Sequence, residues 1–199
     1  MSENKPTHDI IRQLKRRYNV TPDKDKGKEI PFQLYSIFDM GEAFKRNYCW
    51  RIEEDEKVQH LVSVRVTHLI GAASWGGGYI INDSSNWLCC YCEFENLPNA
   101  IILRNVLMEK VANLFRRKSN KSVKFGKRYV IDTKDITGVF FNPKLINLFD
   151  NATNLSLEIV DNKCLLINEG VRNVENVVGM VEIMSELLEM DSANVRQKV

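Results

Sequence analysis

The chain has 199 residues, of which 44% are hydrophobic and 27% are charged, with a formal net charge of +2. This composition is typical of a globular protein, and no apolar run approaches the roughly 20 residues of a membrane-spanning helix. The composition therefore excludes the disordered, fibrous and membrane-spanning classes. A nucleic-acid-binding domain is usually far more basic, so the net charge disfavours that class as well.

Polar and charged residues stand at the N-terminus, and no apolar segment of the secretory type follows them. We therefore expect a cytoplasmic protein without a membrane partner. The cysteine number is odd and lacks the spacing of a small disulfide scaffold, which favours reduced thiols. The cysteines are Cys49, Cys89, Cys90, Cys92 and Cys164.

The first 29 residues predict a helix followed by a linker. Ile10, Ile11 and Leu14 recur at helical spacing, which indicates a short amphipathic helix over residues 8–19. The turn-rich stretch that follows predicts a flexible connection.

Short strands are predicted from residue 31 onward. Val62, Val64 and Val66 alternate with polar residues, which indicates a strand with one face on the core and one in water. Glycine and polar residues over 75–85 predict a hairpin connection. The β-type runs predict antiparallel strands over 32–38, 44–52, 60–70, 86–94 and 100–103.

The second half predicts a helix, a strand, a short helix, a hairpin and a long final helix. Asn142 and Pro143 are typical of a helix start, and Asp161-Asn162 is typical of a two-residue hairpin turn. The predicted ranges are 105–116, 121–132, 143–151, 155–168 and 172–190. The final helix has one apolar face, made of Val174, Val177, Val178, Val181, Met184 and Leu188.

These elements predict an α+β fold, in which an antiparallel sheet, or sheets, of short strands is covered by a long C-terminal amphipathic helix and shorter helices. The predicted domain organisation has three parts. Residues 1–29 form the N-terminal helix and linker, residues 30–190 form a single α+β domain, and residues 191–199 form a disordered tail.

The order of these features resembles an uncharacterised bacterial family of unknown function. The similar positions span about residues 30–170, and the resemblance implies only an α+β fold. They are Phe32, Arg46-Asn47, Leu97-Pro98, Leu103-Arg104, Phe125, Tyr129, Asp132, Asp135, Leu157-Glu158 and Leu165-Leu166. The chain departs from the family pattern after Arg104, where Asn105 and Val106 replace an expected acidic residue.

Cys89, Cys90 and Cys92 form the densest group of potential metal ligands. Structural zinc sites usually present two separated ligand pairs, whereas here Cys90 and Cys92 share a strand face and Cys89 points away. We therefore predict buried thiols, with no metal and no cofactor. His60 and His68 lie in a strand-like run without a catalytic signature, so no cysteine nucleophile is predicted.

Asp132 and Asp135, with Glu158 and Asp161 nearby in the proposed fold, could supply carboxylates for acid–base or metal chemistry. Asp is also favoured as a cap where a strand ends and a turn begins. We therefore interpret Asp132 and Asp135 as capping residues and predict no catalytic residue.

A basic segment over residues 116–128 is the best candidate for a polyanion surface, because aromatic residues interleave its cations. A solvated loop after a helix explains the same residues with fewer assumptions. The candidate residues are Arg116, Arg117, Lys118, Lys121, Lys124, Lys127 and Arg128.

The sequence favours a non-catalytic module that binds a protein partner, because no group of residues has the composition of a catalytic site. Nucleic-acid or polyanion binding through residues 116–128 is the alternative. A metal-dependent or hydrolytic enzyme is the third hypothesis.

Overall fold

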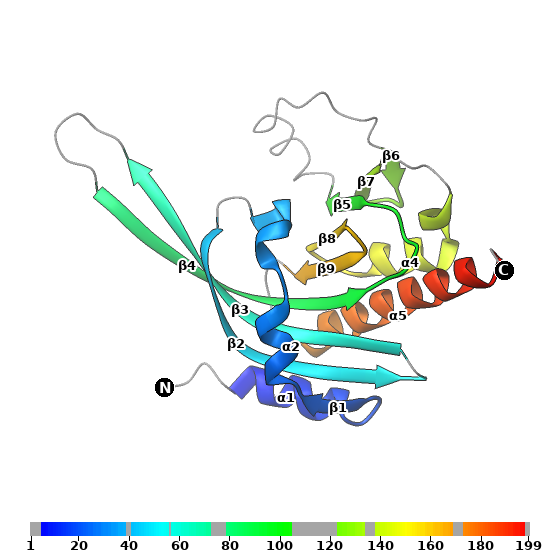
Figure 1. Cartoon of the computed structure of the whole chain (residues 1–199), viewed down its shortest axis with the longest axis horizontal. Coiled ribbons are helices and arrows are strands. Elements are labelled where there is room, and N and C mark those ends of the chain that lie inside the picture. The colour runs from blue at the N-terminus through cyan, green and yellow to red at the C-terminus, as the bar shows by residue number, and fades with distance from the viewer. Residues whose placement is uncertain are drawn as a thin grey trace.

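The computed structural model describes residues 5–38, 41–55, 57–72, 79–104, 123–133, 138–168 and 173–197. These residues form the α+β fold that the sequence predicts, a nine-stranded sheet with the long helix α5 (Val174–Gln197) packed on it (Figure 1). None of the helices in these ranges combines the length and hydropathy of a membrane span.

The remaining elements of the described residues are shorter helices, 3₁₀ turns and the strands of the sheet. The shorter helices are α1 (Lys5–Leu14), α2 (Lys24–Glu29) and α4 (Pro143–Asn151), with 3₁₀ turns η1 (Phe32–Leu34), η2 (Ser36–Phe38) and η3 (Val139–Phe141). The strands are β1 (Asn19–Pro22), β2 (Gly41–Glu54), β3 (Lys57–Ala72), β4 (Tyr79–Glu93), β5 (Ala100–Arg104), β6 (Val123–Phe125), β7 (Tyr129–Thr133), β8 (Leu155–Val160) and β9 (Lys163–Asn168). The strand order is β1-β2-β3-β4-β9-β8-β5-β7-β6, and each neighbouring pair is antiparallel.

Buried residues lie on both faces of the sheet, and successive side chains along a strand point alternately to the two faces. One face, here called the α5 face, packs against α1, α4 and α5 and includes Leu61, Cys90 and Leu166. The opposite face includes Val62 and Leu165 and packs against the chain that follows α2. The sheet therefore lies between two covering layers (Figure 1).

Strands β3 and β4 extend beyond the neighbouring strand β9. They pair without interruption as far as Ala72–Tyr79, whereas β9 pairs with β4 only over Leu88–Glu93. Residues 64–72 and 79–87 therefore form a projecting arm of the sheet (Figure 1). Strand β2 lies along the β3 side of this arm as far as the Gly41–His68 pair.

The predicted strand over residues 32–38 is wrong, because this segment forms the two 3₁₀ turns η1 and η2. The Leu34 and Tyr35 amides donate to the carbonyls of Pro31 and Phe32, which closes a turn rather than a ladder. Phe32 and Tyr35 are buried against the sheet face. The segment thus crosses the sheet as a covering layer instead of joining it.

The prediction of short strands is wrong for β2, β3 and β4, because these strands have 14, 16 and 15 residues. Residues 82–85, predicted as part of a hairpin connection, belong to β4. They continue the pairing with β3 through partners such as Leu69–Asn82 and Val66–Ser85. The long strand β3 pairs with the backbone of these residues, and local turn preferences do not reveal this pairing.

The predicted flexible linker before residue 29 instead contains β1 and α2. Val20 is buried and pairs with Ile52, while the Asp23 carboxylate accepts the Lys26 amide at the start of α2. Gly27 allows α2 to lie on β2, because a Cβ at this position would stand 2.8 Å from Cys49 Cβ.

The predicted disordered tail over residues 191–199 is wrong for residues 191–197, which continue α5. Asp191 is buried, and its carboxylate accepts the amides of Glu95 and Asn96, each at 2.8 Å. These bonds satisfy two loop donors and hold the end of α5 to the chain after β4.

The predicted strand over residues 121–132 is divided into β6 and β7 by a turn. Gly126 has a φ of +65°, a left-handed value that glycine adopts without steric cost. The Asp150 carboxylate accepts the Lys127 amide at 2.8 Å and holds this turn to α4. The helix predicted over 105–116 lies outside the described residues.

Three predictions about the later elements are confirmed. Asn142 caps α4, since its side-chain oxygen accepts the Lys144 amide at 2.8 Å and Pro143 follows. Asp161 and Asn162 form the β8–β9 turn with φ values of 48° and 63°. The long C-terminal helix is α5, in which Val177, Val181 and Met184 of the predicted apolar face are buried, whereas Val174, Val178 and Leu188 are only partly buried.

Candidate functional site

The basic segment lies only partly within the described residues. Lys124 is on β6, Lys127 and Arg128 are in the β6–β7 turn, and all three are exposed. The candidate residues outside the described ranges are Arg116, Arg117, Lys118 and Lys121. Of the seven candidate cations, the described residues therefore include three, which lie on and directly after the edge strand β6.

The five cysteines are buried and form no disulfide with one another. Cys90 and Cys92 point to the α5 face together with Cys164, while Cys89 belongs to the opposite face. The Cys164 Sγ atom contacts the thioether of Met184 at 3.8 Å. Burial raises the pKa of Cys90 and Cys92, so these groups remain protonated thiols in the core.

We expect no cysteine of the native chain to react quickly with a disulfide reagent such as Ellman's reagent. The reagent cannot reach the thiols, because each of them is buried, and burial also disfavours the reactive thiolate form. The pKa of Cys49, for example, is raised by burial to about 12. Spectrophotometric titration should therefore find a rapid reaction only after guanidinium is added. A rapid stoichiometric reaction of one thiol in the native chain would contradict the buried assignment.

His60 lies in a polar network on the face opposite α5. Its Nε2 atom is 3.3 Å from Asp23, and burial lowers its pKa despite the opposing effect of that carboxylate. Nearby, Lys26 and Tyr91 both donate to Glu93, at 2.9 and 2.7 Å. These bonds fasten α2 to β3 and β4. The network has a structural explanation and includes no accessible nucleophile.

The predicted carboxylate group is only partly assembled. Asp132 and Glu158 flank Ile101 in the sheet register, while Asp161 is exposed in the β8–β9 turn. Burial raises the pKa of Asp132. Glu158 accepts the Ser36 hydroxyl at 2.9 Å and the Ile37 amide at 3.1 Å, which anchors η2 to the sheet. Asp135 lies outside the described residues.

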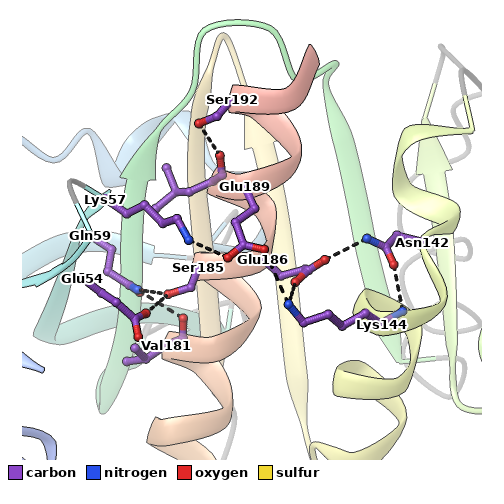
Figure 2. Close-up of polar contacts among 11 residues, drawn as sticks. Glu54, Lys57, Gln59, Asn142, Lys144, Val181, Ser185, Glu186, Glu189 and Ser192 are labelled. Carbon is purple, nitrogen blue, oxygen red and sulfur yellow. Dashed lines mark hydrogen bonds and ion pairs between the residues drawn. The ribbon is translucent and has the colours of Figure 1, made fainter. Parts of the chain in front are cut away.

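A second polar group joins α5 to α4 at the edge of the core (Figure 2). Glu186 is buried, accepts the Asn142 side-chain amide at 2.8 Å, and forms an ion pair with Lys144. Lys144 also lies 3.5 Å from Glu189. The bond to Glu186 raises the pKa of Lys144. These contacts hold α4 against α5, and the carboxylates of Glu186 and Glu189 are both paired with the Lys144 ammonium group.

The same side of α5 is joined to the β2–β3 hairpin (Figure 2). Lys57 donates to Glu189 at 2.6 Å, which lowers the pKa of this carboxyl group. Gln59 donates to Ser185 at 3.1 Å, and Ser185 in turn donates to Glu54 at 3.2 Å. These contacts explain Ser185, Glu186 and Glu189 of α5 as residues that hold the helix in place.

An exposed set of side chains occupies the α5 face at the base of the arm. Tyr48 is 47% exposed, and its ring stacks on Trp50 with a centroid distance of 5.5 Å. Lys45 pairs across the strands with Arg65, and Arg65 pairs with Asn86. We call the exposed residues Lys45, Tyr48, Arg65 and Asn86 the Tyr48 patch.

Lys45 and Arg65 stand directly opposite each other on neighbouring strands, although like charges in this position are destabilising. No carboxylate of the described residues forms an ion pair with either side chain. The Tyr48 patch therefore combines an exposed, stacked aromatic ring with two cations that lack an acidic partner within the described chain.

The sequence prediction missed the Tyr48 patch. Alternation around Arg65 does place it on a solvent face, but that pattern does not reveal which residue of β2 lies opposite. The pairing of Lys45 with Arg65 depends on irregularities in the β2–β3 register, between Gly41 and Ala43 and between Arg46 and Tyr48.

Comparison with protein-family models, curated proteins and solved structures found no match to this chain. The resemblance to an uncharacterised bacterial family stays an expectation from the sequence. The function is therefore inferred from the geometry of the chain itself.

Proposed function

We propose that the chain is a non-catalytic protein-binding module that contacts its partner through the Tyr48 patch. The observation that carries this proposal is the exposed Tyr48 ring, which is held in one orientation by its stacking on Trp50. Tyrosine, tryptophan and arginine are enriched among the residues that contribute most to protein interfaces. A ring that is ordered before binding loses little conformational entropy in the complex.

The two cations of the patch favour a partner with an acidic surface. Repulsion between Lys45 and Arg65 would be offset by a carboxylate placed between them. An arginine fork can bind a carboxylate through two hydrogen bonds, and Asn86 beside it can both donate and accept. The chemistry of the patch thus suits acidic side chains that approach from the solvent side of β2, β3 and β4.

Catalysis has less support than binding. The titratable groups that the fold brings together, such as Asp23 with His60 and Glu186 with Lys144, are bonded to each other. The buried thiols are protonated, as their raised pKa values indicate. A catalytic site instead needs a nucleophile or base directed toward a space that a substrate can occupy.

Nucleic acid is the second candidate partner, because aromatic rings and cations also form single-strand binding surfaces. Lys124, Lys127 and Arg128 are exposed, as a polyanion surface would require. The Tyr48 patch holds two cations, fewer than the stripe that usually follows a phosphate backbone. Protein therefore remains the proposed partner, and nucleic acid is an outcome that the experiment distinguishes.

Affinity capture from native extract tests the proposal with four forms of the chain. We expect the unaltered chain to retain a protein that is lost with Tyr48→Ala and with the double variant Lys45→Glu, Arg65→Glu. The matched control, Lys124→Glu with Lys127→Glu, changes exposed cations outside the patch and should retain the same protein. Equal capture by all forms would contradict the proposal. If nucleic acid is recovered instead, in a salt-sensitive way, and only the control variant loses it, the result would favour nucleic-acid binding.

A further inference from the structure

The described edges of the sheet differ in how they are protected against pairing with another chain. Natural proteins blunt exposed edges by short strands, proline, lysine and β-bulges. Strand β1 has four residues and ends in Pro22, while β6 has three residues and carries Lys124. Strand β2 has two irregularities in its register where it extends beyond β1. Each of these edges shows at least one protective feature.

The β4 edge of the arm has only one feature of this kind, the charged residue Asp83. Residues 79–87 contain no proline and no lysine, and their register with β3 has no bulge. Within the described parts of the chain, no strand pairs with this stretch on the side away from β3, since β9 reaches only Leu88. A regular, extended edge is therefore presented beside the Tyr48 patch.

The backbone groups on this edge can be assigned from the pairing at the other end of β4. The Phe94 amide donates to the Asn162 carbonyl at 2.7 Å, so even-numbered residues of this strand direct N–H and C=O toward β9. Continuing the alternation without a bulge places the backbone groups of Asn82, Ser84 and Asn86 on the open edge. Odd-numbered residues direct theirs toward β3.

We propose that the β4 edge over residues 80–86 receives an extended acidic segment of the partner protein as an added antiparallel strand. This inference rests on the proposed function, because Asn86 belongs to both the edge and the Tyr48 patch. Residues opposite each other in antiparallel strands share a sheet face. The partner residue opposite Asn86 would therefore lie beside Arg65, where an acidic side chain is favoured by charge.

The geometry specifies which amides of the added strand matter. Asn86 directs its backbone groups outward, so the residue opposite it forms a hydrogen-bonded pair and its own N–H points to β4. When a peptide of alternating valine and glutamate binds with its glutamates beside Arg65, the backbone N–H groups of the glutamates therefore donate to β4. N-methylation of the glutamates should abolish binding, whereas N-methylation of the valines should leave most of it.

The experiment measures binding of the alternating valine–glutamate peptide to the full chain by amide chemical shifts. We expect the shifts to centre on residues 80–86 and affinity to fall roughly tenfold with Ser84→Pro, which removes one edge donor. Ser84→Pro should fold, because proline is tolerated on an edge strand where its missing N–H faces outward. The matched control Ser84→Ala keeps the backbone N–H donor and should bind the peptide normally. A peptide with lysine in place of glutamate should not bind.

Several results would overturn this inference. One is equal binding of both N-methylated peptides or of the lysine peptide, and another is slow hydrogen exchange at Asn82, Ser84 and Asn86 in the free chain. Concentration-dependent dimerisation that Ser84→Pro abolishes would assign the edge to a second copy of this chain instead. If Tyr48→Ala prevents capture of the native partner but Ser84→Pro does not, the proposed function stands and the strand-addition inference fails.

Discussion

Removal of α5 by ending the chain before residue 173 is expected to leave it unfolded. Burial of each large apolar side chain contributes about 1.5–3 kcal/mol, and a whole domain is stable by only about 5–15 kcal/mol. The α5 residues that are almost fully buried in the core are Val177, Met180, Val181, Ile183, Met184 and Leu187. Their combined contribution is comparable to the entire stability, so circular dichroism should show loss of the cooperative thermal transition.

The matched control for this truncation ends the chain after Ser192. This shorter deletion keeps the buried apolar residues and Asp191, whose carboxylate binds the Glu95 and Asn96 amides. We expect it to retain a cooperative transition. A chain that ends before residue 173 and melts at the temperature of the full protein would show that α5 does not cover the core.

Phe149→Ala is expected to lower the free energy of unfolding by about 3–5 kcal/mol, as is usual for a buried phenylalanine. Phe149 is fully buried on α4, with its ring edge-on to Phe125 at 5.3 Å and to Tyr129 at 5.2 Å. Truncation leaves a cavity where α4 meets β6 and β7, and removes both ring contacts. Urea unfolding of the variant and of the full protein measures the difference.

Phe149→Leu serves as the control, because it keeps most of the apolar volume and should cost clearly less than the alanine variant. An alanine variant within about 0.5 kcal/mol of the unaltered chain, the range of ordinary surface substitutions, would mean that the α4 contact is not part of the core.

The elements that the sequence predicted well are those whose signals are local. The apolar face of α5, the Asn142-Pro143 start of α4 and the Asp161-Asn162 turn each depend on residues a few positions apart. Caps, turns and helical periodicity need no knowledge of the rest of the fold. Their type was therefore predicted correctly, with errors of a few residues at the ends.

The elements that the sequence predicted poorly depend on distant partners. Residues 32–38 have the composition of a strand, but they cover a face of the sheet, on which Phe32 and Tyr35 are buried. Val20 enters a strand because Ile52 lies beside it, and residues 191–197 remain helical next to the amides that Asp191 binds. Local preferences were overridden by tertiary contacts at each of these places.

The candidate site shows the same division. Buried thiols were predicted from composition, but the convergence of Cys164 with Cys90 and Cys92 required the β4–β9 register. The Tyr48 patch likewise needed the bulged register that places Lys45 opposite Arg65. Surface sets assembled across strands leave no signal in the spacing of a single strand.

The most direct test of the proposed binding surface is calorimetric titration of the captured partner with the full chain and with the Lys45→Glu, Arg65→Glu double variant. Breaking contacts at the centre of an interface usually costs about 2 kcal/mol or more, so we predict an affinity at least about thirtyfold weaker for the variant. The Lys124→Glu, Lys127→Glu control should bind as the full chain does. Equal affinities for the patch variant and the full chain, with both folded, would contradict a protein-binding role for the Tyr48 patch.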